Sequence, residues 1–463
     1  MAEPKKRLAK RAPDDAPDDP LVAHLAAFFA ARPLSLETHL CVALSGGCDS
    51  VVLLHALGQL IRRKKIIARL SALHVHHGLS PQADAWADFC EGFCAQQAIP
   101  LEVVRVSVPR ASGAGLEAAA RRARYAVFSA SPADALLLAH HRDDQAETVL
   151  LNLLRGAGVA GAAAMLPERA STHGPRLLRP CLECSRACLT AYAKTHNLPW
   201  IEDESNDDLH FRRNFLRHEI LPKMSEKFAS APSALARAAR HFADAATLLD
   251  ELAALDRQNA AASSGRLQLA ALKALSPARA RNLLRSEWLR AGFQAPSTRW
   301  LEEALRQLAA TNADSETCVE TTEGRLQLYR GELYFLPQTS AAATRSAQVW
   351  AGETRLSWGQ GSLSLLPVIG LGIARRWLVE GEVFIHPRQG GERLQPDAKR
   401  PRRSVRKLCQ DLAIPPWQRA QLPFLWCAGR LLWVAGLGVD AEFACAPGED
   451  GLLLTWTAGE SAE

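Results

Sequence analysis

One hexapeptide near the start of the chain has the residues needed to bind a pyrophosphate. It consists of Ser45, Gly46, Gly47, Cys48, Asp49 and Ser50, directly after an apolar run and before a helical pattern. Two glycines let successive N–H groups point at an anion, and the N-terminus of the following helix adds positive potential. The serine hydroxyls can donate to phosphate oxygens, and Asp49 can hold a Mg²⁺ that neutralises them. The alternative is a plain turn with helix-capping side chains, but the complete hexapeptide favours a phosphate site.

A second polar segment, residues 139–148, follows another apolar run. Glu147 follows Asp143 by four residues and Asp144 by three, which places the three carboxylates together on the first turn of a helix. For Asp143 alone, stabilisation of the helix N-terminus is the expected role. Asp144 and Glu147 are expected at the same sheet edge as the hexapeptide, where two carboxylates can receive a cationic substrate.

Histidines and cysteines supply further candidates for contact with a ligand. His140 and His141 are adjacent, so one is expected to approach a nucleotide while the other packs. Of the histidines that end the second apolar run, His74 is the candidate ATP contact. Cys181, Cys184 and Cys188 lack a fourth ligand nearby, which argues against a zinc site. The Cys-x-x-Cys pair nevertheless keeps a sulfur-transfer role open.

The elements that must position these residues alternate along the chain. Apolar runs at residues 40–44, 68–75, 101–106 and 135–139 are separated by helical patterns at 49–61, 82–98, 116–130 and 145–155. Continuous apolar strands between helices predict an α/β, doubly wound, mostly parallel sheet covered on both faces. Ligands bind such sheets outside the carboxyl ends of the strands. We therefore expect the chemistry in the loops after residues 44, 75 and 139.

The hexapeptide resembles the SGGxDS signature of the PP-loop, or N-type, ATP pyrophosphatases, which split ATP between its α and β phosphates to adenylate a substrate. Other segments resemble the tRNA(Ile)-lysidine synthetase family in their order and spacing. These are HVHHGL at 74–79, ARYAVF at 123–128, AHHRDDQAET at 139–148, LLRGAG at 153–158, LRP at 178–180, WIEDESN at 200–206 and RRNFLR at 212–217. The resemblance is dense over residues 40–222.

The resemblance implies a two-step ligase that joins lysine to the wobble cytidine of the isoleucine tRNA with a CAU anticodon. An adenylated cytidine would be the intermediate, and AMP and pyrophosphate would be released. ATP and Mg²⁺ are the implied cofactors, with ATP bound by residues 45–50. Asp144 and Glu147 correspond to the family's lysine-binding positions. An arginine near the reacting centre would be Arg213, with Arg212 as the second choice.

Length and composition are those of an ordinary globular protein with several domains. The chain has 463 residues, of which 48% are hydrophobic and 22% charged, with 55 Lys and Arg against 49 Asp and Glu. Eleven scattered cysteines favour a reducing compartment, here the cytoplasm. We expect a disordered tail over residues 1–20, a catalytic domain over 21–224, a helical middle domain over 225–345 and a small α+β tRNA-binding domain over 346–463. A hairpin is predicted at 326–336 and a linker at 338–347.

Residues 388–407 carry eight Lys or Arg against Glu392 and Asp397. A solvated loop is the plain interpretation, but the segment also resembles part of the family's tRNA-gripping C-terminal domain. The candidate phosphate contacts are Lys399, Arg400, Arg402, Arg403, Arg406 and Lys407.

The partners expected are the CAU-anticodon isoleucine tRNA and L-lysine, with a homodimer left open and no membrane. The apolar run at 21–31 lacks a cationic flank and predicts a helix. The run at 422–439 contains Gly429 and Arg430 in its middle, which favours a buried hairpin over a membrane helix. Two other functions stay open: another PP-loop enzyme, such as a tRNA thiolase, and a non-catalytic basic RNA-binding protein.

Overall fold

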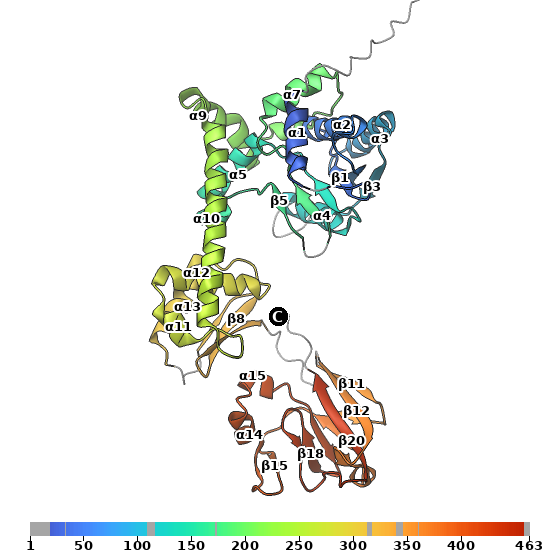
Figure 1. Ribbon diagram of the computed structural model, residues 1–463, viewed down its shortest axis with the longest axis vertical. Helices are drawn as coiled ribbons and strands as arrows, with labels where there is room; N and C mark the ends of the chain where they lie inside the picture. Colours follow the sequence, from blue (N-terminus) through green and yellow to red (C-terminus); the bar gives the residue numbers. More distant parts are fainter. Residues whose placement is uncertain are drawn as a thin grey trace, which may run out of the picture. The chain divides into compact units, whose positions relative to one another are not determined.

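The computed structural model describes residues 19–32, 34–108, 116–171, 174–312, 317–338, 346–359 and 361–457. The chain forms two compact units, Met1–Leu248 and Leu249–Glu463 (Figure 1). Of the tail predicted over residues 1–20, residues 1–18 lie outside the described residues, and so does most of the linker predicted over 338–347.

A six-stranded sheet forms the centre of the first unit, in the order β3-β2-β1-β4-β6-β5. Pairing is parallel from β3 to β6, and only β5 runs antiparallel to its neighbour. Because β1 pairs with β2 on one side and with β4 on the other, the strand order reverses between β1 and β4, where such sheets bind ligands. This confirms the predicted doubly wound, mostly parallel sheet. Its strands are β1 His39–Ala43, β2 Arg69–His76, β3 Leu101–Arg105, β4 Ala135–Leu137, β5 Glu168–Arg169 and β6 Arg176–Leu178.

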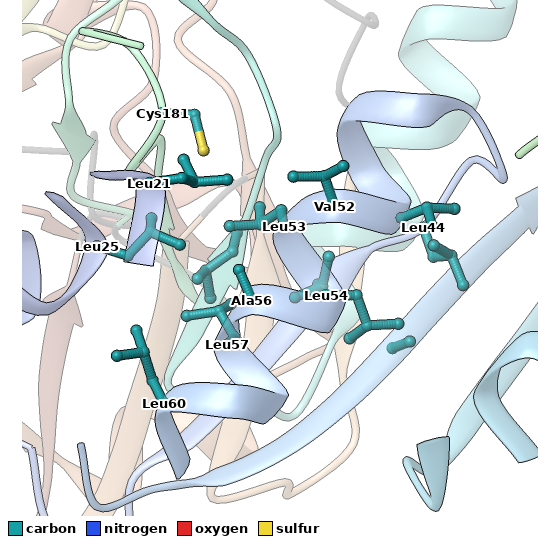
Figure 2. Packing of buried hydrophobic residues seen from close by; sticks show 14 of the residues in the cluster. Leu21, Leu25, Leu44, Val52, Leu53, Leu54, Ala56, Leu57, Leu60 and Cys181 are labelled. Atoms are coloured by element: carbon teal, nitrogen blue, oxygen red, sulfur yellow. The ribbon is translucent and has the colours of Figure 1, made fainter. Parts of the chain in front are cut away.

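Helices cover both faces of this sheet. Alternate residues of β1 point to opposite faces, so Leu40 and Val42 enter one core while Cys41 enters the other. The first core receives α1 Pro20–Ala30, α2 Cys48–Arg62, α3 Ala83–Gln97 and α7 Arg186–Thr195. Figure 2 shows the packing of α1 and α2 there, with Cys181 beside Leu21. The second core receives Phe128 of α4 Leu116–Ala130. The apolar run at 21–31 is therefore a core helix, as predicted.

Of the remaining helical elements in the first unit, two follow β4 and the others begin at residue 204 or later. α5 begins three residues before the helical pattern seen in the sequence, because His141 caps it. The segment after residue 211 contains a π-helical turn, η2, between two short α-helices. These elements are α5 Arg142–Leu154, α6 Val159–Ala162, η1 Glu204–Asp207, α8 Arg212–Phe215, η2 Leu216–Ile220 and α9 Leu221–Lys227. The next helix, α10 Ala231–Ala260, begins in the first unit and continues past Leu248 into the second.

Part of the second unit packs three helices against a three-stranded antiparallel sheet around one core. Arg330 and Gly331 both have positive φ angles, of 50° and 77°, as a two-residue hairpin turn requires. The hairpin predicted at 326–336 is confirmed. The elements are α11 Leu269–Ala274, α12 Pro277–Arg290, α13 Thr298–Ala310, β7 Cys318–Glu320, β8 Gly324–Tyr329 and β9 Glu332–Pro337.

The rest of the second unit surrounds a separate core with two larger sheets. One has the order β10-β14-β17-β18-β19 and the other β11-β12-β20-β13. The apolar run at 422–439 contains the hairpin of β17 and β18, as predicted. Bounds are β10 Gln348–Trp350, β11 Arg355–Trp358, β12 Gly361–Ile369, β13 Ile373–Ala374, η3 Arg375–Val379, β14 Val383–His386, β15 Arg393–Leu394, β16 Arg403–Ser404, α14 Val405–Asp411, α15 Pro416–Arg419, β17 Phe424–Cys427, β18 Arg430–Val434, β19 Gly438–Val439 and β20 Asp450–Thr457.

Within the described parts of the chain, none of the helices combines the length and the apolar character that a bilayer crossing requires.

Candidate functional site

A cavity of about 350 Å³ opens at the carboxyl ends of β1, β2 and β4. This is the edge at which the sequence predicts the chemistry. Its apolar wall includes residues from the three strand ends and from α4. Its polar groups come from the three predicted loops, from the end of β2, from α4 and from the residue before η1. The polar lining residues are Ser45, Asp49, Ser50, His74, His76, His77, Arg124, Tyr125, His140, Asp144 and Asp203.

The loop between β1 and α2 has the geometry of an anion cradle. Gly46 has a φ of +86°, and a Cβ on it would lie 2.7 Å from Cδ1 of Ile201, so this position requires glycine. The Gly46 carbonyl accepts a hydrogen bond from Ile201 N at 2.9 Å. Gly47 caps α2 without any side-chain hydrogen bond, which leaves N-terminal amides of α2 available to a phosphate.

The two serines of the loop have different surroundings. The Ser50 hydroxyl donates to the Gly47 carbonyl at 3.0 Å and accepts from Ser45 N at 3.2 Å. Ser50 therefore holds the loop together in this structure, and it also lines the cavity, so its donation to a phosphate stays a prediction. The Ser45 hydroxyl lies 3.1 Å from that of Ser50 and lines the cavity.

Asp49 has one oxygen available for a cation. Its Oδ1 is buried without a hydrogen-bond partner, and its Oδ2 lies 3.6 Å from His141 Nε2. Across the described residues, no group of three or more His, Cys, Asp or Glu side chains is arranged to hold a metal by itself. A single carboxylate still fits Mg²⁺, because Mg²⁺ usually binds one or two carboxylates together with substrate phosphates and water.

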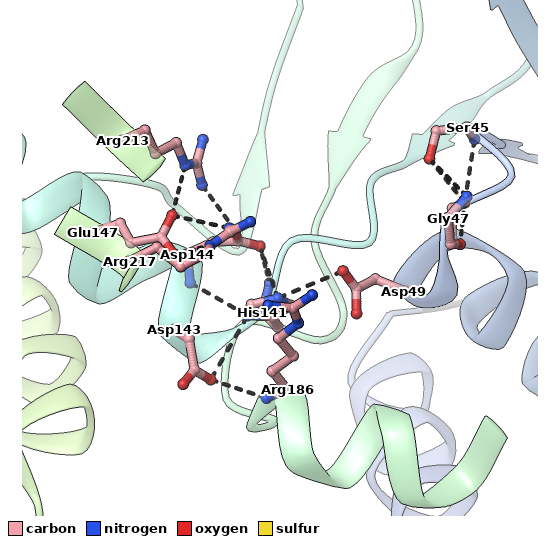
Figure 3. A network of polar contacts seen from close by, with 11 residues as sticks. Ser45, Gly47, Asp49, His141, Asp143, Asp144, Glu147, Arg186, Arg213 and Arg217 are labelled. Atoms are coloured by element: carbon pink, nitrogen blue, oxygen red, sulfur yellow. Dashed lines mark hydrogen bonds and ion pairs between the residues drawn. The ribbon is translucent and has the colours of Figure 1, made fainter. Parts of the chain in front are cut away.

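His141 connects Asp49 to the start of α5 (Figure 3). Its side chain is 1% exposed, and its Nδ1 accepts a hydrogen bond from Asp144 N at 3.3 Å. In return, Asp144 Oδ2 accepts from His141 N at 3.0 Å, which completes a capping box. Nε2 is the ring nitrogen that faces Asp49, and although burial opposes it, the neighbouring Asp49 carboxylate raises the pKa of His141.

Asp143 lies in the first turn of α5, as the sequence predicts, and its side chain also contacts another helix. Its Oδ2 accepts a hydrogen bond at 2.9 Å from Arg186 N, at the start of α7. His141 is the N-cap of α5, and Asp144 completes the capping box because its side chain accepts from His141 N. Asp143 therefore fastens the N-terminus of one helix to that of another.

Asp144 and Glu147 are both held by arginines (Figure 3). Arg213 donates from Nε to Glu147 Oε2 at 2.7 Å and from Nη2 to Asp144 Oδ1 at 2.9 Å. Arg217 donates from Nε to Glu147 Oε1 at 2.6 Å and from Nη2 to Asp144 Oδ1 at 3.0 Å. Glu147 is 1% exposed and Asp144 is 7% exposed, so two nearly buried carboxylates are paired with two guanidiniums.

This pairing changes the electrostatics of the acidic pair. Although burial opposes it, the charges of His141 and Arg213 hold the pKa of Asp144 below its usual value. Although burial opposes it, the hydrogen bond to Glu147 raises the pKa of Arg217. Asp144 is therefore ionised, and both carboxylates are already paired with guanidinium groups. Arg212, the second predicted catalytic arginine, is exposed instead. Arg217 was missed, although its spacing of four from Arg213 places both on one helical face.

The adjacent histidines divide as expected. His140 lines the cavity, and burial lowers its pKa to about 3, so it is neutral near pH 7. Its Nδ1 is buried without a hydrogen-bond partner. His74 also lines the cavity, where it donates from Nδ1 to the Leu44 carbonyl at 2.8 Å, and burial lowers its pKa.

The predicted tRNA-binding cations lie in the second unit and fall into two groups. Arg402 donates to Asp440 at 2.9 Å, and Arg403 lies 2.6 Å from Asp411, so both make intramolecular ion pairs. The other four, Lys399, Arg400, Arg406 and Lys407, are exposed, although Arg400 also lies 3.5 Å from Asp397.

Known protein families cover most of the chain. Residues 19–224 match a PP-loop domain, 267–334 a TilS substrate binding domain and 383–456 a TilS substrate C-terminal domain. A tRNA(Ile)-lysidine synthase of Azoarcus sp. is 42% identical over 96% of this chain and 97% of its own length. That of Aromatoleum aromaticum is 46% identical over 92% and 99%, and that of Nitrosomonas europaea 43% identical over 90% and 91%. The chain belongs to the tRNA(Ile)-lysidine synthase family.

Proposed function

We propose that this protein is an ATP-dependent ligase that joins lysine to the wobble cytidine of the isoleucine tRNA with a CAU anticodon. The relatives are named tRNA(Ile)-lysidine synthases. We take the tRNA and the lysine substrate of the proposal from that name. One observation carries the proposal for this chain: His141 links Asp49 of the phosphate loop to Asp144 of the acidic pair. A nucleotide and a cationic substrate can therefore meet at one edge of the sheet.

In the first step, the cytidine O2 attacks the α-phosphorus of ATP, a P–O bond forms and pyrophosphate leaves. The amides of α2 and the loop glycines hold the phosphates, and Ser45 donates from its hydroxyl. Mg²⁺ bound by Asp49 and phosphate oxygens would neutralise charge there. The neutral His140 lines the same cavity with Nδ1 unpartnered, and we assign it to the nucleotide. The base must leave the anticodon stack to reach this site.

In the second step, the ε-amine of lysine attacks C2 of the adenylated cytidine, the C–O bond breaks and AMP leaves. Asp144 and Glu147 would orient lysine, but both carboxylates are paired with Arg213 and Arg217. We infer that lysine exchanges with these guanidiniums, which frees Arg213 to contact the adenylate. The arginines lie on α8 and on the π-helical turn η2, and such turns are frequent at functional sites.

Competition between arginine and lysine gives a specific prediction. We expect Arg217→Gln to lower the KM for lysine by roughly 10-fold, because it leaves more negative charge at the acidic pair. Arg217→Lys is the matched control, since it keeps a cation there and should leave KM close to that of the unchanged protein. Steady-state incorporation of labelled lysine measures both variants. A higher KM in Arg217→Gln would mean that Arg217 helps to bind lysine, against the exchange.

The proposed activity is tested by incubating the protein with ATP, labelled lysine and a CAU-anticodon isoleucine tRNA. We expect the label to appear in the tRNA. No label should be incorporated when labelled ornithine or labelled arginine replaces lysine, or when the GAU-anticodon isoleucine tRNA replaces the CAU-anticodon one. Absence of label while a thiol donor is consumed would favour a thiolase. RNA binding with no ATP cleavage would favour a non-catalytic protein.

A substitution at Asp49 tests the phosphate site separately. We expect Asp49→Asn to slow tRNA-dependent pyrophosphate release on the order of 100-fold or more, since it removes charge from the proposed Mg²⁺ ligand. Asp88→Asn, at an exposed position of α3, is the control and should be near the unchanged rate. Circular dichroism checks that both variants keep the fold. Normal pyrophosphate release by Asp49→Asn would refute the assignment.

A further inference from the structure

The proposed ligation makes no use of a pair of cysteines in the turn that precedes α7. Cys181 and Cys184 are both free thiols and both buried. Cys184 N donates to the Cys181 carbonyl at 2.8 Å, so the two residues close a single turn. In such a turn the first and fourth Cα atoms lie within about 7 Å, which overlaps the range of Cα separations found in disulfides.

A histidine from a distant part of the chain lies against this turn. His24, on α1, donates from Nε2 to the Pro180 carbonyl at 2.9 Å. The neighbouring Cys184 raises the pKa of His24 to about 9, although burial opposes it. Hydrogen bonds from Cys181 and then His24 lower the pKa of Cys184, with a further contribution from the charge of Arg142. Near pH 7 this geometry is that of an imidazolium beside a thiolate.

Other cysteines of the first unit lie in a different environment. Burial raises the pKa of Cys48 to about 11, of Cys90 to about 12 and of Cys94 to about 11. Cys188, four residues beyond Cys184, also has a raised pKa because of burial. These thiols are therefore protonated and weakly nucleophilic near neutral pH, and Cys184 is set apart from them.

We propose that Cys184 and Cys181 form a peroxide-reactive pair that closes reversibly to a disulfide. The Cys184 thiolate attacks one oxygen of a hydroperoxide, the O–O bond breaks, and the leaving oxygen takes a proton to give water or an alcohol. The Cys181 thiol then attacks the sulfur of the Cys184 sulfenic acid and gives up its proton to the departing hydroxyl group. The S–O bond breaks and water leaves. The two cysteines lose two electrons, which the hydroperoxide gains, and a reduced dithiol reverses the reaction.

Exposure is consistent with this order of events. Cys184 is 8% exposed, whereas Cys181 is 0% exposed. A small oxidant therefore reaches Cys184 first, and the second step needs only the neighbouring thiol inside the turn. Large alkylating reagents would reach Cys184 slowly, so the test uses hydrogen peroxide as the oxidant.

The turn is hydrogen-bonded to the helix that carries the acidic pair. The Cys184 carbonyl accepts from Arg142 N, the first residue of α5, at 2.8 Å. Asp143 in turn accepts from Arg186 N at 2.9 Å. Disulfide closure would thus strain the first turn of α5, and we expect its amides to exchange hydrogen faster in the oxidised protein.

Peptide mapping tests the pair in the full-length protein, whatever its substrate. The chain is treated with a slight excess of hydrogen peroxide, blocked with a thiol reagent after denaturation and cleaved with trypsin. Cleavage after Arg186 leaves Cys181 and Cys184 on one peptide and Cys188 on the next. We expect the first peptide to lose two hydrogens and escape blocking, and a dithiol to reverse both changes. Complete blocking of Cys181 and Cys184 after peroxide would overturn the proposal.

Three variants test the separate roles of Cys184, Cys188 and His24 in disulfide formation. Cys184→Ser should abolish the oxidised peptide, and Cys188→Ser should leave it unchanged. His24→Gln should slow disulfide formation by roughly 10-fold, because Cys184 loses a cationic neighbour. Equal rates in His24→Gln and in the unchanged protein would contradict the role of the imidazolium. Stoichiometric zinc released from the purified protein by a mercurial would also overturn the proposal, because the thiolates would then be metal ligands.

Discussion

Two adjacent glycines of the phosphate loop are constrained for different reasons. Gly46 has a positive φ and its Cβ position is filled by the side chain of Ile201. Gly47 has a φ of −71° and a ψ of 160°, which any residue adopts. A Cβ on Gly47 would meet only the Ser45 hydroxyl, at 3.5 Å. The loop therefore needs Gly46 for its backbone conformation, while Gly47 leaves the amides of α2 uncovered.

These positions give a paired prediction. Gly46→Ala should lower the free energy of unfolding by about 1–3 kcal/mol, because it combines a left-handed backbone with a steric overlap. Gly47→Ala should change it little, because its backbone is extended and its Cβ fits. Urea unfolding followed by tryptophan fluorescence compares them. Equal losses in both variants would show that the loop has another conformation.

The residues of the site could be predicted from the sequence, but some of their contacts could not. The motif predicted that Asp49, Asp144 and Arg213 matter, and the structure places all three in one connected network. The contact of Asp143 with α7 was not visible, because Arg186 is 43 residues away in sequence. Helical periodicity identifies neighbours on one helix but says nothing about which other helix supplies a donor.

Between elements, the start of α5 is fastened to the start of α7 by hydrogen bonds in both directions. Asp143 accepts from Arg186 N, and the Cys184 carbonyl accepts from Arg142 N. Strands and hairpins were easier to predict than such contacts. Apolar runs located β1, β2 and β4, and the Arg330–Gly331 pair located a turn, because these signals are local.

Removal of the Asp143 carboxylate should destabilise the N-terminus of α7. We expect Asp143→Ala to weaken the N-terminus of α7 by about 1 kcal/mol, since Arg186 N loses its acceptor. Asp143→Asn keeps a carbonyl oxygen and serves as the control. Hydrogen exchange, read on a peptide that covers the start of α7, should be faster in the alanine variant. Identical exchange in the two variants would show that the contact contributes nothing to α7.

For the whole molecule, the modest excess of positive charge is less informative than its placement. The chain has six more Lys and Arg than Asp and Glu, and the exposed Lys399, Arg400, Arg406 and Lys407 lie within ten residues of one another. Arg402 and Arg403 are engaged with carboxylates, so charge counting from the sequence overestimates the cations that are available to a phosphate backbone.

Salt dependence tests the exposed cations directly. We expect Arg406→Ala combined with Lys407→Ala to weaken tRNA binding and to reduce the slope of log Kd against log salt by about one for each phosphate that is no longer neutralised. The matched control is Arg62→Ala with Lys64→Ala, which removes two exposed cations around the C-terminal end of α2. Fluorescence titrations over a range of KCl concentrations measure both. A variant line parallel to that of the unchanged protein would contradict phosphate binding by these residues.

The pairing of Glu147 with Arg213 and Arg217 also has a consequence for how the protein is made. These contacts join residues 66 and 70 positions apart in the chain. While a ribosome is still synthesising the segment before Arg213, Glu147 on the already emerged α5 has neither guanidinium available. Burying that carboxylate unpaired is costly. The carboxyl edge of the sheet should therefore stay open during synthesis, and α5 should dock fully only when residues beyond 217 have left the exit tunnel.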